Sequence, residues 1–149
     1  MPYTKIAATA AAALLMPLLA NAAGTAPDVK GVWTGKTQPI VAGAGGHWPG
    51  NKGTFDNPGL PEGEVKITIK GQEGQRFWGT KTISGGGATI DEPFIGVLHG
   101  PRMTDALIAD TDGYMDGTFR GNVFSFCYAH AGGPTKTSLV TCAETKRPR

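Results

Sequence analysis

The chain has 149 residues, with 14 Lys and Arg, 12 Asp and Glu, and a formal net charge of +2. This near balance of charge gives no electrostatic basis for binding nucleic acid. Glycine is abundant at 23 residues and proline at 11, while 40% of the residues are hydrophobic. The composition argues against a helix bundle or a disordered chain, and favours many short strands joined by tight turns.

The N-terminal segment 1–22 is predicted to be a removable secretion signal. Lys5 precedes an apolar run of about 15 residues, and small residues at 20 and 22 fit a cleavage site. The run is shorter than the roughly 20 residues that cross a bilayer, and it contains Pro17, so no transmembrane anchor is expected. We therefore expect a single domain over 23–149 that works in the periplasm or is secreted.

Eight short strands are predicted in the mature chain. Residues 65–70 alternate apolar and polar side chains, as in a half-buried strand. Turn signals rich in Gly, Asp and Pro separate the later strands, and no segment has convincing helical periodicity. The strands are expected at 31–37, 65–70, 76–84, 92–99, 105–110, 114–120, 123–130 and 137–146.

These strands predict an all-β fold, an eight-stranded antiparallel up-and-down (meander) β-barrel with one long loop after the first strand. Eight strands can close completely, which removes unpaired edges and leaves an interior filled by side chains or by one small ligand. Trp33 is the expected plug of one barrel end. Glycines inside strands, such as Gly79, Gly96 and Gly117, are expected to permit the sharp coiling of a small barrel.

Cys127 and Cys142 are predicted to form a cross-strand disulfide. If the intervening turn is centred on 133–136, the numbers of opposing residues add up to 269, which places the two cysteines face to face. Facing residues have Cβ atoms close enough for a disulfide, and an oxidising compartment would preserve the bond. A metal site would need more thiol or imidazole ligands, and only His130 is near.

The segment 38–63 is predicted to be a long loop, because it contains four prolines and has neither helical nor strand periodicity. It carries Trp48 and Phe55. Exposed aromatic side chains are costly, so these two residues either fold back to close a barrel end or engage a partner.

A set of mainly aromatic residues is predicted to contact a ligand. Phe124, Phe126 and Tyr128 share one face of a strand and would form core or a barrel lining, while Asp116 lies inside a strand and is considered as a buried carboxylate. The complete set of candidate ligand-binding residues is Trp48, Phe55, Trp78, Asp116, Phe124, Phe126 and Tyr128.

No catalytic motif is present in the sequence, so we expect no enzyme activity, no cofactor and no bound metal. His47, His99 and His130 are scattered, and nothing in the sequence fixes them together. The segment 110–113 begins like a calcium loop but lacks the distal Glu, so it is predicted to be a turn.

The motif Gly31-Val32-Trp33 followed by a secreted meander resembles the calycin group, which comprises lipocalins and avidins. In that group a G-x-W motif on the first strand plugs one barrel end, and in lipocalins a late Arg packs on the Trp. The resemblance implies this role for Arg147. Residues 34–37, Thr-Gly-Lys-Thr, depart from the Asn-Ser-Tyr-type set with which avidins bind biotin.

The architecture also resembles small periplasmic inhibitors of proteases or lysozyme, which are disulfide-bonded eight-stranded barrels. The sequence thus favours an exported, non-enzymatic barrel that binds a small hydrophobic or amphipathic ligand. The alternative is a module that binds an extracytoplasmic protein.

Overall fold

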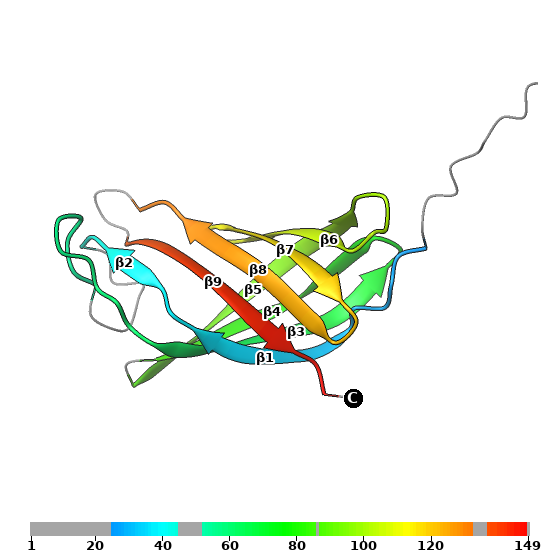
Figure 1. The fold of residues 1–149 in the computed structure, drawn as a ribbon, viewed down its shortest axis with the longest axis horizontal. Helices are drawn as coiled ribbons and strands as arrows, with labels where there is room; N and C mark the ends of the chain where they lie inside the picture. The colour runs from blue at the N-terminus through cyan, green and yellow to red at the C-terminus, as the bar shows by residue number, and fades with distance from the viewer. Residues whose placement is uncertain (1–24, 45–51, 86, 133–136, 149) are drawn as a thin grey trace, which may run out of the picture.

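In the part of the chain that this computed structural model describes, nine β-strands form one sheet that closes on itself (Figure 1). The structure describes residues 25–44, 52–85, 87–132 and 137–148, so the predicted secretion signal lies outside the described residues. The strands are β1 (Gly31–Thr37), β2 (Ile40–Ala42), β3 (Gly63–Glu73), β4 (Arg76–Gly85), β5 (Ala88–His99), β6 (Asp105–Asp110), β7 (Tyr114–Arg120), β8 (Val123–His130) and β9 (Ser138–Lys146).

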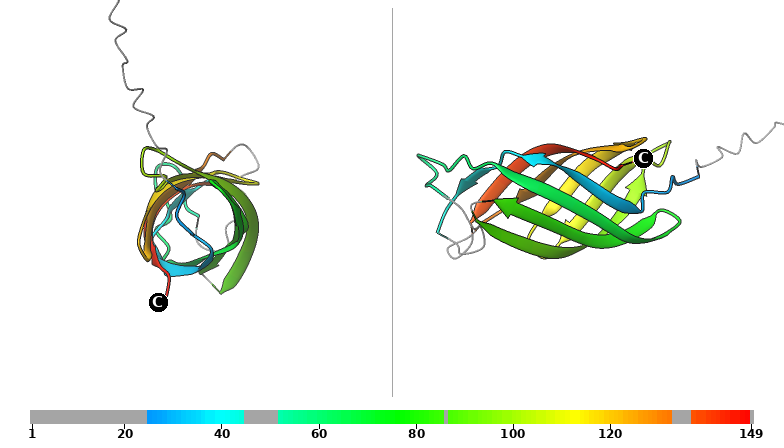
Figure 2. Two further views of the ribbon diagram at one scale, coloured as in Figure 1. Left: turned by 90° about the vertical axis from the view of Figure 1, so that its right-hand side faces the viewer. Right: turned by 90° about the horizontal axis from the view of Figure 1, so that it is seen from below.

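The strand order is that of a meander. Strands β3 to β9 pair with their chain neighbours in antiparallel fashion, and β1 pairs with both β3 and β9. The closing pair sets Thr34 opposite Lys146 and Thr37 opposite Ala143. Viewed along the barrel, the strands form a closed ring (Figure 2). The predicted eight-stranded antiparallel barrel is confirmed, with β2 as an extra short strand.

Strand β2 corrects the prediction that the long loop has no strand. Ile40 pairs with Val140 in a register that continues from β1, so β2 extends β1 along β9. Pro39 separates β1 from β2, because it has no backbone N–H to donate to the hydrogen bonds between strands. Val41 is fully buried and exchanges backbone hydrogen bonds of 3.0 and 2.8 Å with Gly59.

Most other strand boundaries agree with the sequence prediction, and β1, β6, β7 and β8 have the expected limits. The turn between the strands expected at 65–70 and 76–84 is shorter than these limits imply and consists of Gly74 and Gln75. Strand β3 runs on to Glu73 because its register with β4 shifts between Ile69 and Gly71. The next hairpin is also tighter than expected, since β4 and β5 remain paired as far as Gly85 and Ala88.

The core consists of the inward-facing residues of every strand. Along β8, alternate residues from Phe124 to His130 are buried while the residues between them are exposed. Aromatic rings fill the barrel near β1. The centroid of the Phe119 ring lies 5.1 Å from that of Trp33 and 4.1 Å from that of Phe124.

Two glycines inside strands make room for these rings. A Cβ added to Gly96 would lie 2.5 Å from the Phe77 ring, and one added to Gly117 would lie 2.7 Å from Cε2 of the Phe124 ring. These contacts are too short for any side chain. Besides permitting strand coiling, each glycine therefore gives an aromatic ring a place against the backbone.

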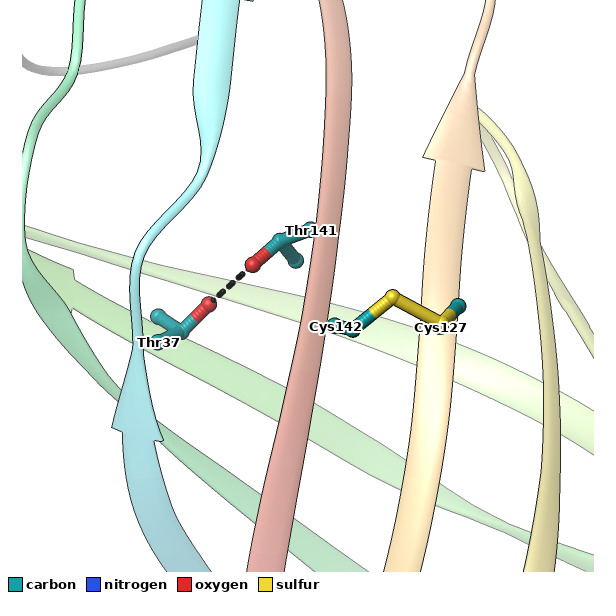
Figure 3. Close-up of a disulfide and its surroundings, with 4 residues drawn as sticks. All are labelled: Thr37, Cys127, Thr141 and Cys142. Atoms are coloured by element: carbon teal, nitrogen blue, oxygen red, sulfur yellow. Dashed lines mark hydrogen bonds between the residues drawn. A yellow bond between two sulfur atoms is a disulfide. The ribbon is translucent and has the colours of Figure 1, made fainter.

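The predicted disulfide is confirmed. Cys127 and Cys142 are directly opposed in the β8–β9 register and are bonded to each other. Figure 3 shows the bond joining these strands, near a 2.7 Å hydrogen bond between the hydroxyls of Thr37 and Thr141. Both cysteines face outward, whereas the two threonines are buried.

Replacing both cysteines by alanine is expected to lower the free energy of unfolding by about 3 kcal/mol, because the bond restricts the unfolded chain. The barrel should still form, since eight opposed residue pairs join β8 to β9. Urea unfolding and circular dichroism of the oxidised protein and the double variant would measure both effects. Loss of strand signal in the variant would contradict the second expectation.

Within the described part of the chain, no helix has the length and apolar character needed to cross a membrane.

Candidate functional site

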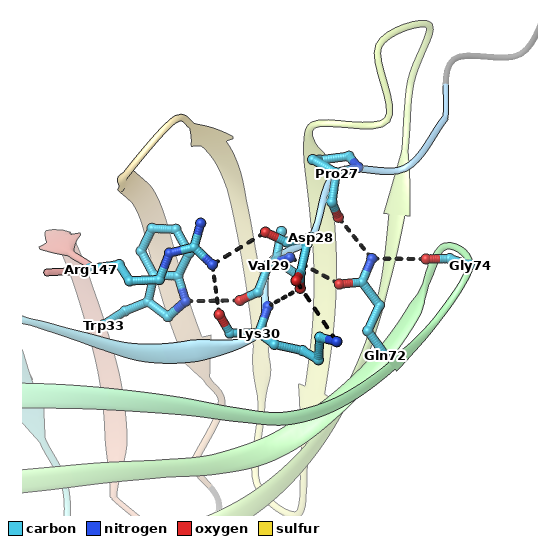
Figure 4. A network of polar contacts seen from close by, with 8 residues as sticks. All are labelled: Pro27, Asp28, Val29, Lys30, Trp33, Gln72, Gly74 and Arg147. Carbon is cyan, nitrogen blue, oxygen red and sulfur yellow. Dashed lines mark hydrogen bonds and ion pairs between the residues drawn. The ribbon is translucent and has the colours of Figure 1, made fainter. Parts of the chain in front are cut away.

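Trp33 occupies one end of the barrel, where the chain segments before β1 and after β9 meet (Figure 4). Its ring is fully buried, and its Nε1 donates a 3.0 Å hydrogen bond to the carbonyl oxygen of Val29. The Arg147 guanidinium lies 4.7 Å from the centre of the ring. It also donates to the carbonyl oxygens of Asp28 and Lys30, at 3.2 and 2.6 Å. Arg147 thus forms the contact that the calycin resemblance implies.

Gln72, near the end of β3, ties the leading segment to the same barrel end. Its Oε1 accepts a 2.9 Å hydrogen bond from the backbone N–H of Val29. Its Nε2 donates to the carbonyl oxygens of Pro27 and Gly74, at 2.8 and 2.9 Å. The Trp33 end is therefore closed by packing and by a network of hydrogen bonds between side chains and backbone groups.

A buried ionic cluster lies inside the barrel, away from the Trp33 end. The Nζ atom of Lys81 on β4 is 2.6 Å from a carboxylate oxygen of Glu92 on β5 and forms a second ion pair with Asp110 on β6. It also lies 3.6 Å from the centre of the Tyr128 ring on β8. All three charged side chains are almost completely buried. Such charges are tolerated in a core only when they are paired.

Hydrogen bonds hold Asp110 in its ionised form. Burial by itself would raise the pKa of this carboxyl, but the hydrogen bond and charge of Lys81 and the backbone N–H groups of Asp112 and Gly113 outweigh it, so the pKa is lowered. The backbone N–H groups of Asp112 and Gly113 donate to Oδ1 of Asp110 at 3.0 and 2.7 Å, and these bonds close the turn predicted at 110–113. Burial and the nearby carboxylates of Asp110 and Glu92 raise the pKa of Tyr128, which stays protonated and donates to Asp110 at 3.2 Å.

The sequence prediction missed this cluster, although strand alternation contained a signal for it. Lys81 has the same parity as Phe77 and Ile83 along β4, and Glu92 has the same parity as Phe94 and Leu98 along β5. A charged residue in phase with apolar ones inside a strand indicates a buried charge. Since neighbouring strands supplied opposite charges, the pairing could have been anticipated.

The interior beside this cluster has little free space. A cavity of about 10 Å³ lies beneath Pro39, bordered by apolar and hydroxyl side chains and by Lys81. That volume is close to the minimum for one water molecule. Small-molecule sites have volumes of about 300 to 1,000 Å³.

The predicted ligand-binding residues do not form one site. Phe124, Phe126 and Tyr128 are buried together along β8. Trp78 and Asp116 point outward from β4 and β7, so the expectation of a buried Asp116 carboxylate is wrong. Alternation explains both orientations, because Phe77 and Met115 occupy the neighbouring inward positions.

Phe55 lies on a turn at the barrel end opposite Trp33, and Trp48 lies outside the described residues. The backbone N–H of Thr54 donates to the carbonyl oxygen of Asn57 at 2.9 Å, and that of Asn57 donates to the Thr54 hydroxyl at 3.1 Å. Phe55, between them, is 77% exposed. It therefore does not fold back into the barrel. Residues 52–62 extend past the end of the barrel (Figure 1).

The histidines are not brought together. His99 is exposed on β5, His130 is buried on β8, and His47 lies outside the described residues. The part of the chain that the structure describes contains no group of three or more His, Cys, Asp or Glu placed to hold a metal ion.

These features define a closed antiparallel β-barrel with one end plugged by an aromatic residue, a buried ionic cluster and a projecting loop at the other end. Comparison of the chain with protein-family models, curated proteins and solved structures found no match.

Proposed function

We propose that this chain is an exported, non-enzymatic binding protein with a calycin-like barrel, which docks on a second protein through the loop at its unplugged end. The predicted N-terminal secretion signal and the disulfide support a periplasmic or secreted location. The contact between Trp33 and Arg147 supports the calycin-like assignment.

The observation that carries the proposal is the exposure of Phe55. A phenylalanine that is 77% exposed gains nothing from the protein's own core, yet its turn is held by backbone hydrogen bonds. A pre-ordered turn loses little conformational entropy on binding, and buried aromatic anchors contribute much of the affinity at protein interfaces. An inhibitor that inserts such a turn into the cleft of a secreted hydrolase fits this description.

A small hydrophobic ligand inside the barrel has weaker support. Such a ligand needs a cavity of at least about 300 Å³, and the cavity beside the ionic cluster measures about 10 Å³. A protein partner requires no interior space, and among the large apolar side chains of the described residues Phe55 is the most exposed.

Replacing Phe55 by alanine is expected to leave folding unchanged and to weaken partner binding about 30-fold, the effect of losing an aromatic anchor worth about 2 kcal/mol. Immobilised wild-type protein would be used to capture partners from an extracytoplasmic extract, and the variant would be compared by titration. Val32→Ala removes an exposed apolar side chain from β1 and is the matched control. Native mass spectrometry that found a small molecule bound to the purified protein, together with equal capture by all three proteins, would contradict the proposal.

A further inference from the structure

The outer surface of β4 to β7 carries a row of apolar side chains across four adjacent strands. Trp78 is opposite Ile95, Ile95 is opposite Ala109, and Ala109 is opposite Tyr114. Trp78, Ile95 and Tyr114 are 46%, 70% and 68% exposed. The row therefore presents apolar surface to solvent on a face that is not covered by any other described part of the chain.

A second row lies beside it and has opposite charges at its two ends. Arg76 is opposite Val97, Val97 is opposite Leu107, and Leu107 is opposite Asp116. A shallow groove of about 570 Å³ runs over the two rows and is lined by all of their residues except Asp116, which lies just beyond it. Arg76 and Glu73 form an exposed ion pair of 3.1 Å, which contributes little stability and leaves Arg76 able to pair elsewhere.

The composition of this face is that of an interface centre. Trp, Tyr and Arg are the residue types that most often dominate binding energy, and lysine is depleted at interfaces. Lysines instead occupy the outward positions of β1 and β3, at Lys36, Lys66 and Lys70. Because the barrel is closed, a partner at this face must be bound by side chains rather than by added strand pairing.

We propose that this face joins two copies of the chain in a symmetric dimer. A two-fold axis that runs along the strands, between β5 and β6, reverses the order of each row in the second copy. Arg76 of one copy then meets Asp116 of the other, at both ends of the interface. In the same arrangement Ile95 meets Ala109, a large side chain against a small one, and Val97 meets Leu107. Trp78 meets Tyr114 at both ends of the first row, so the face is complementary to itself in charge and sets apolar side chains against apolar ones.

This inference does not depend on the proposed docking loop. The segment 52–62, which contains Phe55, extends past the end of the barrel, whereas the two rows lie on strands β4 to β7 (Figure 1). A dimer would leave both copies of the loop available, so the two proposals can fail separately.

Sedimentation of the purified protein over a range of micromolar concentrations tests the dimer. The wild-type protein should sediment as a dimer, and Ile95→Lys should weaken self-association at least about tenfold by placing a charge at the centre of the interface. Val32→Lys, which changes an exposed apolar residue on β1, should leave self-association unchanged. A wild-type monomer throughout, or equal effects of both substitutions, would overturn the proposal.

A charge exchange tests the symmetry. Arg76→Asp and Asp116→Arg should each weaken self-association about tenfold or more, because each puts like charges together at both ends. An equimolar mixture of the two variants should restore the dimer, since every contact then pairs Asp with Arg. A mixture that associates as weakly as the separate variants would overturn the two-fold arrangement.

Discussion

Replacing Trp33 by alanine is expected to lower the free energy of unfolding by about 3 to 5 kcal/mol, the usual range for removing a large buried aromatic side chain. The ring is fully buried and packs against Phe119. Its loss would leave a cavity at the barrel end, and Arg147 would lose its aromatic partner. Urea unfolding monitored by circular dichroism gives the change directly.

Phe55→Ala provides the control, because this aromatic side chain is 77% exposed and lies outside the proposed dimer face. Its replacement should change the stability of the monomer by no more than about 1 kcal/mol. If Trp33→Ala had an effect as small as that, Trp33 would not be the plug of the barrel.

Replacing Lys81 by methionine is expected to destabilise the protein by about 3 to 5 kcal/mol at neutral pH, because it leaves buried charges without their partner. Glu92 and Asp110 would then face each other's charge without the ammonium group between them. The double variant Lys81→Met, Glu92→Gln should recover about half of this loss, since one carboxylate is neutralised.

The destabilisation by Lys81→Met is expected to shrink as the pH falls. In the wild-type protein the pKa of Asp110 lies below its usual value of 3.8. Ionised Asp110 therefore adds stability above that value, and this contribution is lost as the pH falls through the lower pKa of the folded state. Without Lys81, burial favours the protonated form of Asp110, so acid should relieve the defect. Thermal unfolding between about pH 3 and pH 7 measures the difference, and an effect independent of pH would contradict this assignment.

The strands and their order were predictable because the turns are local signals. The Gly-Gly-Pro-Thr motif at 132–135 predicted the register of the β8–β9 hairpin, which places Cys127 opposite Cys142. The limits of β6 and β7 likewise follow from flanking Gly, Asp and Pro residues. Such features depend on residues close together in the chain, and a single sequence contains them.

The orientation of β4 was harder to predict, because each face of the strand carries both apolar and polar side chains. One phase places Phe77 and Ile83 inside together with Lys81, and the other places Trp78 inside with threonines. Only the acidic residues of β5 and β6 make the first phase favourable, since they pair with Lys81. That information lies in other strands, so strand-by-strand inspection could not supply it.

The contact of Arg147 with the first strand shows the same limit. Position alone places Arg147 in an exposed C-terminal tail, but closure of the barrel brings β9 beside β1 and sets Arg147 over Trp33. Only the resemblance to calycins indicated this contact. Long-range packing of this kind is determined by the completed fold.

The pairing of β1 with β9 also has a consequence for the order of folding. The Arg147 side chain donates a hydrogen bond to the carbonyl oxygen of Lys30, although the two residues are 117 positions apart in the chain. The hairpins between β3 and β9 can form as the chain emerges, because each uses neighbouring segments, but the seam between the first and last strands cannot. Contacts between such distant segments form slowly, and until they do both seam strands have open edges. The chain is therefore most exposed to misassociation and proteolysis just before its last strand docks.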